Sequence, residues 1–571
     1  MKKTILFITL NLLSVGLTFS QSFEWGINIG QWTNDYPIDI DKTSDGVLIT
    51  TTANGYETKG LYRYDSEGNE IWKFDFFDDF DNYGFVASAV DMNDNIYTLL
   101  SRPGEYGGFT TVNGINIYNG ISLLKINSQG NVEWNIKIGG QSSGANILYK
   151  NDFLYILGQF YGEINIKDEI TLNSQQYWDC FSWIYRTGED FYVAKFNIDG
   201  NLVDAKNFGE DYPDYVTSVT IDNNENIYLT GGSDFHSCTT RYTHITKVNS
   251  NLDIEWKKEI SKEENSSQLI YPSNIYYSQN GKIYLWGYNR LSIIHPDYTI
   301  PESTCSDLST NQGFSSNLLE FNATNGNFLK YKSYTTCTIN PIWQVSGTVS
   351  TTLMNKGLMT DFNDNELIVF TSFNRPIEFN NGLYEPTHQI SQYDEFFYEE
   401  NLLLFKVDKQ TLDSNYIVSF SGELSNQYAE KSKDNPGPIL LDDNNSLYIT
   451  ASFQENPIYI FNGTINNNSG NNNSDVLVSK IDLQNILSIQ DHYRLTYLST
   501  YPNPVKNELN FSTKNEINNI KIYSTEGKLV MNYSSIGNNN KIDLSNLKKG
   551  VYFGQFFSKN NTISIKKIIK E

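Results

Sequence analysis

The residues best suited to recognising a ligand are aromatic and acidic side chains in two polar segments of the chain. One segment lies near position 180, and the other spans residues 393–400 with the sequence YDEFFYEE. The candidates are Tyr177, Trp178, Trp183, Tyr185, Tyr393, Asp394, Phe396, Phe397 and Tyr398. Aromatic rings beside carboxylates suit stacking on sugars or contact with a protein partner. We therefore expect a binding surface here. The alternative, that these rings only pack their own segments, stays open.

Four cysteines fall in segments of the same kind: Cys180, Cys238, Cys305 and Cys337. An even number of cysteines favours disulfides where the chain meets an oxidising compartment. We expect the pairs Cys180–Cys238 and Cys305–Cys337, and the other pairings stay open. The sequence has no Cys-x-x-Cys spacing, so a zinc site is not expected.

Patterns typical of catalysis are weak. Residues 140–144 match Gly-x-Ser-x-Gly, but this segment leads into a connection between strands, whereas a nucleophile elbow needs a strand-to-helix turn. The five histidines form no His-Glu-x-x-His motif. Turns such as residues 91–95 could wrap Ca²⁺, yet Asp and Asn are also ordinary turn formers, and we expect plain turns. We predict no cofactor and no metal.

Short strands recur along the chain and carry these segments. A polar turn followed by a strand occurs seven times, as in DNNENIYLT at 222–230 and DDNNSLYIT at 442–450. A second strand follows each copy, often with a turn and a tryptophan after it. Its characteristic basic position holds Arg63, Lys125, Lys195, Lys247, Lys406 and Lys480, with Glu320 in the fifth copy. Units of four antiparallel strands, spaced by about 70 residues, indicate a β-propeller. We predict an all-β chain with a single seven-bladed β-propeller over residues 21–490.

Residues 23–30 copy the last strand of a unit. Their sequence FEWGINIG resembles VEWNIKIG at 132–139. Residues 23–30 thus look like the fourth strand of a unit, but no first, second or third strand comes before them, so they need the sheet of another unit to join. The seventh unit has only a short fourth strand of its own. We predict that residues 23–30 complete the seventh sheet, so changing Trp25 should destabilise the whole domain.

The units resemble the SBBP-type bacterial β-propeller repeat and, more loosely, the quinoprotein-like repeat. The resemblance is carried by segments such as LYRYDSEGNEIW at 61–72 and GQFYGEINI at 158–166, and it implies a fold but no activity. The long connections are 161–190, 233–242, 288–316, 374–400 and 454–474 within units and 334–356 between units. In a propeller such connections emerge on one face, and loops grouped on a rigid scaffold often bind ligands.

The amino-terminal end is typical of a secretory signal peptide. Residues 1–20 combine Lys2 and Lys3 with a short apolar core, which predicts cleavage before Gln21. No segment is long and apolar enough to predict a transmembrane helix. The net charge of −24 argues against nucleic acid and anionic membranes as partners.

After a linker at 491–500, residues 501–571 read as a small β-sandwich with a basic balance of eleven Lys against five acidic residues. The ordered motifs Tyr-Pro-Asn-Pro, Gly-Lys, Leu-x-x-Gly-Val-Tyr and a Lys-rich end resemble the type A C-terminal sorting domain of the type IX secretion system. The resemblance implies Pro502, Asn503, Pro504, Gly527, Gly550, Lys566, Lys567 and Lys570 as sorting features. It also implies that the secretion machinery is a partner and that the chain passes through the periplasm to be secreted or displayed on the cell surface.

For the central domain we favour a binding module for a glycan or a protein. An extracellular polysaccharide hydrolase or lyase, acting through the carboxylates of residues 393–400, stays open. A structural or adhesive surface protein is a further alternative.

Overall fold

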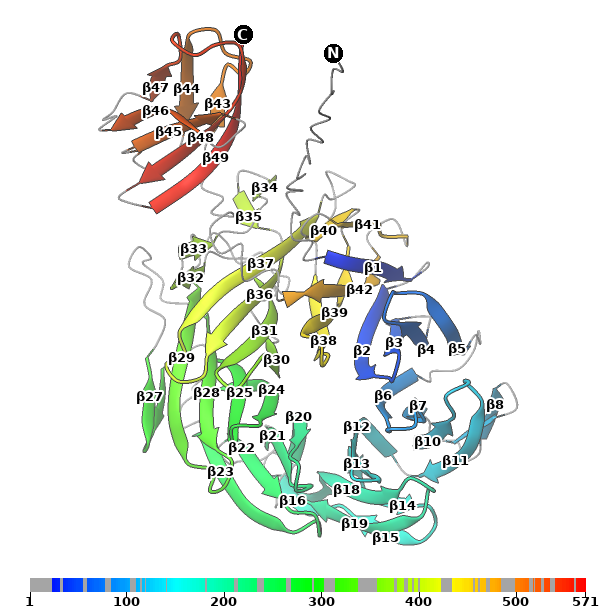
Figure 1. Cartoon of the computed structure of the whole chain (residues 1–571). Helices are drawn as coiled ribbons and strands as arrows, with labels where there is room; N and C mark the ends of the chain where they lie inside the picture. The colour runs from blue at the N-terminus through cyan, green and yellow to red at the C-terminus, as the bar shows by residue number, and fades with distance from the viewer. Residues whose placement is uncertain are drawn as a thin grey trace, which may run out of the picture.

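The structure is a computed structural model in which every described element is a β-strand (Figure 1). It describes residues 23–30, 34–54, 59–76, 84–102, 109–112, 115–118, 120–139, 141–179, 182–209, 214–233, 241–262, 269–289, 292–301, 314–336, 357–373, 377–380, 382–384, 389–392, 395–398, 401–422, 434–454, 457–460, 463–468, 473–483, 499–512, 517, 519–524, 528–534, 540–558 and 561–571. None of these residues belongs to a helix long and apolar enough to cross a membrane.

Within the described part of residues 23–483, seven sheets share one plan of four antiparallel strands, and we number them in chain order. Sheet 1 contains β2 (Asn34–Lys42), β3 (Gly46–Asn54), β4 (Lys59–Asp65) and β5 (Glu70–Phe76). Sheet 2 contains β6 (Gly84–Val90), β7 (Ile96–Arg102), β10 (Gly120–Ile126) and β11 (Val132–Ile138). Sheet 3 contains β12 (Gln141–Lys150), β13 (Phe153–Tyr161), β18 (Glu189–Asn197) and β19 (Leu202–Phe208). Sheet 4 contains β20 (Asp214–Ile221), β21 (Ile227–Ser233), β22 (Tyr242–Val248) and β23 (Ile254–Lys262).

The remaining three sheets follow the same order. Sheet 5 contains β24 (Tyr271–Ser278), β25 (Lys282–Asn289), β28 (Phe314–Asn322) and β29 (Phe328–Thr336). Sheet 6 contains β30 (Gly357–Asp361), β31 (Glu366–Phe373), β36 (Asn401–Asp408) and β37 (Ser414–Gly422). Sheet 7 contains β38 (Asn435–Leu441), β39 (Ser446–Phe453), β42 (Asp475–Asp482) and β1 (Phe23–Ile29).

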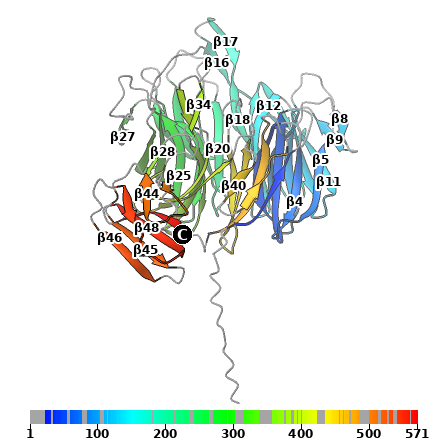
Figure 2. The ribbon, with the colours of Figure 1, turned by 90° about the horizontal axis from the view of Figure 1, so that it is seen from above.

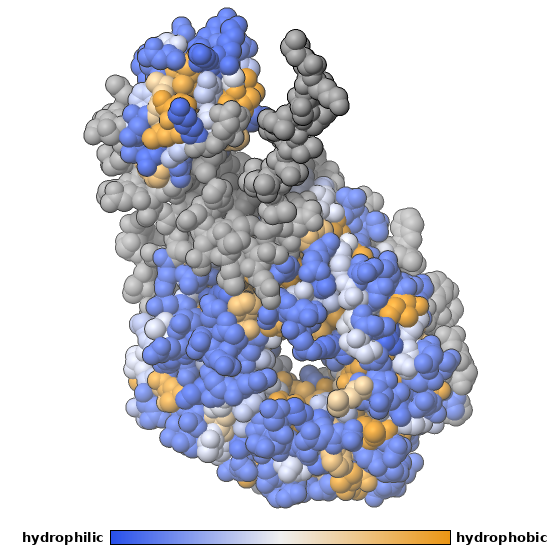
Figure 3. Space-filling view, viewed as in Figure 1, coloured by the Kyte–Doolittle hydropathy of each residue, from blue (hydrophilic) through white to orange (hydrophobic). Residues whose placement is uncertain are grey.

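The first strand of each sheet packs on the first strand of the next, and β38 packs on β2. Figure 1 shows these strands innermost around a central opening, which Figure 3 shows from the same side. Buried clusters span neighbouring sheets; one joins Leu123 of sheet 2 to Ile156 and Tyr192 of sheet 3. Each sheet therefore buries both faces against its neighbours, which explains the apolar runs of β36 and β39.

The turns between first and second strands are built on one aspartate. Asp91 accepts the backbone N–H of Asn93 at 2.8 Å and of Asn95 at 2.9 Å. Asp222 and Asp442 make the same pair of contacts in sheets 4 and 7. These carboxylates thus cap their own turns, as Asx-turns do.

The predicted pairing of the amino-terminal strand with the last unit is confirmed. β1 pairs antiparallel with β42, with Trp25 opposite Lys480 and Ile29 opposite Val476. Sheet 7 therefore combines β1, the first described strand, with the last strands of residues 23–483. It cannot form until both of these parts of the chain are present.

The long connections contain strands that were not predicted from the sequence. Several fold into two-stranded hairpins: β8–β9 (Phe109–Val112, Ile115–Tyr118), β14–β15 (Glu163–Ile166, Ile170–Asn173), β16–β17 (Gln176–Asp179, Ile184–Thr187), β26–β27 (Ile293–His295, Tyr298–Ile300), β32–β33 (Ile377–Phe379, Gly382–Tyr384), β34–β35 (Gln389–Gln392, Glu395–Tyr398) and β40–β41 (Ile458–Ile460, Gly463–Ile465). Hairpin β14–β15 pairs with β11 and hairpin β40–β41 pairs with β37. The reason is that an outer strand has an unpaired edge, and a hairpin can cover it.

The carboxy-terminal residues form two sheets around their own core. One sheet contains β43 (Ser499–Tyr501), β44 (Glu508–Ser512) and β47 (Lys541–Asp543). The other contains β46 (Leu529–Ser534), β45 (Asn519–Ser524), β48 (Gly550–Ser558) and β49 (Asn561–Lys570). Phe511 from the first sheet and Ile522 and Phe556 from the second meet in one buried cluster, the packing expected of a β-sandwich.

Candidate functional site

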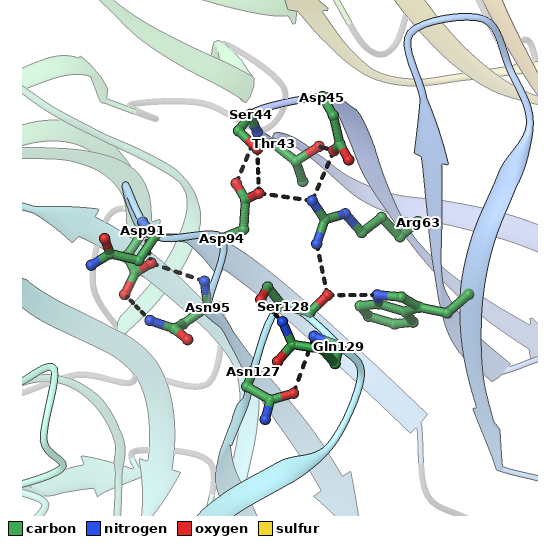
Figure 4. Close-up of polar contacts among 12 residues, drawn as sticks. Thr43, Ser44, Asp45, Arg63, Asp91, Asp94, Asn95, Asn127, Ser128 and Gln129 are labelled. Carbon is green, nitrogen blue, oxygen red and sulfur yellow. Dashed lines mark hydrogen bonds and ion pairs between the residues drawn. The ribbon is translucent and has the colours of Figure 1, made fainter.

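The basic residue of the sequence pattern joins neighbouring sheets. Arg63 of sheet 1 donates to Asp45 at 2.8 Å, to Asp94 at 2.7 Å and to the Ser128 carbonyl at 2.8 Å. Asp94 and Ser128 lie in turns of sheet 2 (Figure 4). Partial burial would raise the pKa of Asp45, but the hydrogen bond and charge of Arg63 lower it below its usual value. Arg63 is itself buried, so this network holds two sheets together.

The same kind of contact recurs between other sheets. Lys195 of sheet 3 donates to Glu225 at 3.0 Å and to the Ser250 carbonyl at 3.2 Å, both in turns of sheet 4. Lys480 of sheet 7 donates to the Ser66 carbonyl of sheet 1 at 3.3 Å. The repeated cation is therefore structural in each of these places.

The fifth unit keeps the contact with its charges exchanged. Glu320 stands opposite Lys330 in the sheet, and Lys330 Nζ lies 3.2 Å from Glu320 Oε2. Lys330 then donates to the Lys409 carbonyl at 2.9 Å, in a turn of sheet 6. Glu320 looked like an exception in the sequence pattern, but the cation has only moved to the adjoining strand.

The tryptophans of the pattern lie against glycine turns of the next sheet. A Cβ on Gly130 would stand 3.2 Å from the Trp72 ring, and one on Gly68 would stand 2.7 Å from the Trp25 ring. Both glycines have positive φ angles, +84° and +85°, so each turn needs glycine for its backbone as well. Each indole Nε1 also donates to a carbonyl of the same turn, at 2.9 Å for Trp25 and 3.0 Å for Trp72. Trp25 thus makes in sheet 7 the contacts that Trp72 makes in sheet 1.

Two carboxylates on the innermost strand β2, Asp39 and Asp41, face β6. Burial raises the pKa of Asp39 to about 6; burial and then the charge of Asp39 raise the pKa of Asp41. Asp39 accepts the Ser88 backbone N–H at 3.2 Å, and Asp41 accepts the Ser88 hydroxyl at 2.5 Å. In sheet 4 the hydroxyls of Ser218 and Thr220 accept backbone N–H groups of sheet 5 in the same way. Because hydroxyl groups accept the equivalent hydrogen bonds between sheets 4 and 5, we interpret Asp39 and Asp41 as structural groups that join sheet 1 to sheet 2.

Five hairpins in the described part of the chain form two-stranded sheets of their own, and β16–β17 is one of them. Figure 2 shows β16 and β17 projecting beyond the other strands on one side of the seven sheets. An isolated two-stranded hairpin contributes little stability by itself. A role outside the folding of the domain therefore has to be considered for β16–β17, which we call the aromatic hairpin.

The aromatic hairpin exposes three large rings. Trp178 stands opposite Tyr185, and their ring centroids lie 5.0 Å apart at an interplanar angle of 63°. Trp183 lies 6.5 Å from Trp178 at 82°. The exposed fractions are 42% for Trp178, 75% for Trp183 and 68% for Tyr185. The rings touch one another but are not buried, so packing within the loop does not account for them.

Buried groups anchor the base of the hairpin. The Gln175 backbone N–H donates to Asp190 Oδ2 at 3.1 Å, and the Asn207 amide donates to the same oxygen at 3.2 Å. Asp190 is fully buried, and this burial raises its pKa. Tyr177 is only 7% exposed, which makes it an anchor of the hairpin and not part of the exposed cluster.

The structure reaches only some of the predicted ligand-binding residues. It brings Trp178, Trp183 and Tyr185 together. Of the second segment, Phe396, Phe397 and Tyr398 lie in β35, where only the backbone is described. The remaining predicted residues lie outside the described residues: Tyr393, Asp394, Cys180, Cys238, Cys305, Cys337, Gly527 and the signal segment 1–20. Within the described part of the chain, no group of three or more His, Cys, Asp or Glu side chains could hold a metal ion.

The sorting motif Tyr-Pro-Asn-Pro is tied to the last strand. Asn503 donates to the Lys567 carbonyl at 2.7 Å and accepts the Ile569 backbone N–H at 2.8 Å. Next to it, the Val505 N–H donates to the Ile569 carbonyl at 2.7 Å. Lys567 is exposed, whereas Lys570 is buried. The first motif and the Lys-rich end are thus one structural unit.

Comparison with known families identifies this carboxy-terminal unit. Residues 499–571 match the family described as secretion system C-terminal sorting domain. The predicted sorting domain is thereby confirmed, and its match begins where β43 begins. The chain is exported through the periplasm to the cell surface or the extracellular space, and its tail interacts with the secretion machinery.

Solved structures similar to this chain share little sequence with it. A protein of unknown function from Dyadobacter fermentans has a TM-score of 0.35 at 9% identity, over 81% of this chain and 98% of that chain. Drosophila Plexin A in complex with Semaphorin 1b has a TM-score of 0.37 at 9% identity, over 81% and 87%. Synechocystis apocarotenoid oxygenase has a TM-score of 0.31 at 10% identity, over 66% and 69%. These scores support no argument on function. No curated protein matches the chain in sequence.

Proposed function

We propose that the chain is an exported binding protein: a seven-bladed β-propeller, closed by β1, that contacts an extracellular ligand through the aromatic hairpin. Residues 1–20 would be the signal peptide, and the units would belong to the SBBP-type repeat that they resemble. The packing of β38 on β2 and the pairing of β1 with β42 support closure.

The exposure of Trp178, Trp183 and Tyr185 is the observation that carries the binding role. Exposure of an apolar ring to water is unfavourable in free energy, so such rings usually lie in the protein core. Elsewhere in the domain aromatic residues fill the joints between sheets, as Trp25 and Trp72 do. Rings left in solvent on a projecting hairpin are therefore best explained by a ligand that covers them.

The test uses the mature exported protein and a variant with three changes, Trp178→Ala, Trp183→Gly and Tyr185→Ala. Glycine is chosen at position 183 because Trp183 has a φ of +56°, which glycine adopts without strain. Both proteins are applied to a glycan array and to an array of extracellular proteins and peptides. The proposal expects at least one bound class that the variant loses while its melting temperature stays the same.

Tyr459→Ala is the matched control, because Tyr459 is also an exposed ring, at 41%, but lies on β40. Binding that all three proteins share, or no binding on either array, would refute the proposed site. Release of reducing sugars from a polysaccharide panel would instead support the alternative of a hydrolase or lyase.

A further inference from the structure

We infer that the ligand of the aromatic hairpin is a neutral polysaccharide whose sugar rings stack on Trp178, Tyr185 and Trp183; this inference rests on the proposed function above. It is carried by the angles between the rings, the size of the exposed patch, the polar groups on the same face and the charge of the chain.

The rings form a corner and not a stack. Trp178 meets Tyr185 at 63° and Trp183 at 82°, so the rings touch edge to face. Edge-to-face contact leaves broad ring faces uncovered, in agreement with the exposed fractions of 68% for Tyr185 and 75% for Trp183. The face of an aromatic ring is electronegative and attracts weakly positive C–H groups. A pyranose ring presents such C–H groups on its flat side and keeps its hydroxyl groups at the rim.

The area of the patch favours a small repeating ligand over a folded protein. A Trp or Tyr side chain offers about 200 Å², so the exposed fractions of the three rings leave about 300–450 Å² in water. A stable protein–protein interface buries about 800 Å² on each partner. The patch is therefore about half the size that a protein partner needs, whereas it is large enough for a few sugar rings.

Polar groups lie on the same face of the hairpin as the rings. Side chains alternate along a strand, so Gln176 shares the face of Trp178, and Thr187, which pairs with Gln176, shares the face of Tyr185. An amide and a hydroxyl can each donate and accept hydrogen bonds, which is what sugar hydroxyl groups require. The net charge of −24 disfavours an anionic polymer.

Affinity electrophoresis tests the ligand class. The mature protein is run in native gels that contain hydroxyethylcellulose, xyloglucan, galactomannan or soluble starch, with alginate and polygalacturonate as anionic gels. We expect retardation in at least one neutral gel. Trp178→Ala, Tyr185→Ala and Trp183→Gly should each weaken binding by about fivefold, since an aromatic contact is worth about 1 kcal/mol and 1.4 kcal/mol corresponds to a factor of ten.

The controls separate this inference from the proposed function. Trp178→Phe should keep part of the affinity because it keeps a ring, and Tyr459→Ala should bind like the unchanged protein. The inference would be overturned if the protein migrated in every neutral gel as it does in a gel without polysaccharide. Retardation only in the anionic gels, or retardation that the three ring variants retain, would also overturn it. If the protein array shows hairpin-dependent binding while all the neutral gels show none, the ligand class is wrong but the binding role stands. If neither experiment shows hairpin-dependent binding, both fail.

Discussion

Replacing Trp25 by alanine tests whether the amino-terminal strand closes the ring. Trp25 donates a hydrogen bond of 2.9 Å to the Ser66 carbonyl, packs on Gly68 and lies 5.9 Å from the Tyr448 ring. A typical intramolecular hydrogen bond contributes about 1 kcal/mol, and Trp→Ala costs about 3–5 kcal/mol at a fully buried site. Trp25 is half-buried, so we expect the free energy of unfolding to fall by about 3 kcal/mol.

Trp72 provides the matched comparison. Its Nε1 donates at 3.0 Å and its ring packs on Gly130, so Trp25 and Trp72 occupy equivalent joints. Equilibrium unfolding in guanidinium chloride should give losses for Trp25→Ala and Trp72→Ala that agree within about 1 kcal/mol. The exposed ring of Trp183 serves as the control for solvent-facing positions, where substitutions change stability by about 0.5 kcal/mol or less.

The result that refutes this reasoning is specific. If Trp25→Ala unfolds at the unchanged denaturant midpoint while Trp72→Ala unfolds earlier, β1 is an appendage of the domain and not a part of its closure. If neither substitution changes the denaturant midpoint, the tryptophan–glycine contacts do not hold the sheets together.

Three further predictions concern other joints and the tail. Burial raises the pKa of Asp39 from 3.8 to about 6, so between these pH values the folded protein keeps a proton that the unfolded chain has released, and Asp39 loses its stabilising effect as the pH rises. The melting temperature of Asp39→Asn should therefore rise relative to that of the unchanged protein between about pH 4 and about pH 7. Lys330→Ala should cost about 2 kcal/mol in chemical unfolding because it leaves buried Glu320 without its cation, and adding Glu320→Gln should restore part of the loss. Asn503→Ala removes two hydrogen bonds to β49. Immunoblots should therefore show less protein in the surface and medium fractions and more in the periplasm. An unchanged distribution would mean that this contact is not needed for sorting.

The strands and turns could be predicted from the sequence because their signals are local. Alternating Val, Ile and Tyr residues bounded by Asp, Asn and Gly predict strands wherever they occur, and the Asp91 turn shows why, since its carboxylate caps its own backbone. The pairing of β1 with β42 was also predictable, because residues 23–30 copy a fourth strand that had no sheet of its own. The sorting tail was predictable because its motifs are short and occur in a fixed order, so they can be read from the sequence without the tertiary structure.

The structure revealed contacts that depend on residues far apart in the chain. Lys330 replaces the missing cation of Glu320, and no local pattern shows this, because the contact depends on which residue stands opposite in the sheet. The sequence placed Tyr177 with the other rings of the aromatic hairpin, but Tyr177 is buried while Trp178, Trp183 and Tyr185 are exposed. Local sequence patterns determined that this is an all-β chain with aromatic connections, and the motifs of its tail determined that it is exported. Which rings meet solvent is set by tertiary packing, since burial depends on the neighbours that folding brings to each face of a strand.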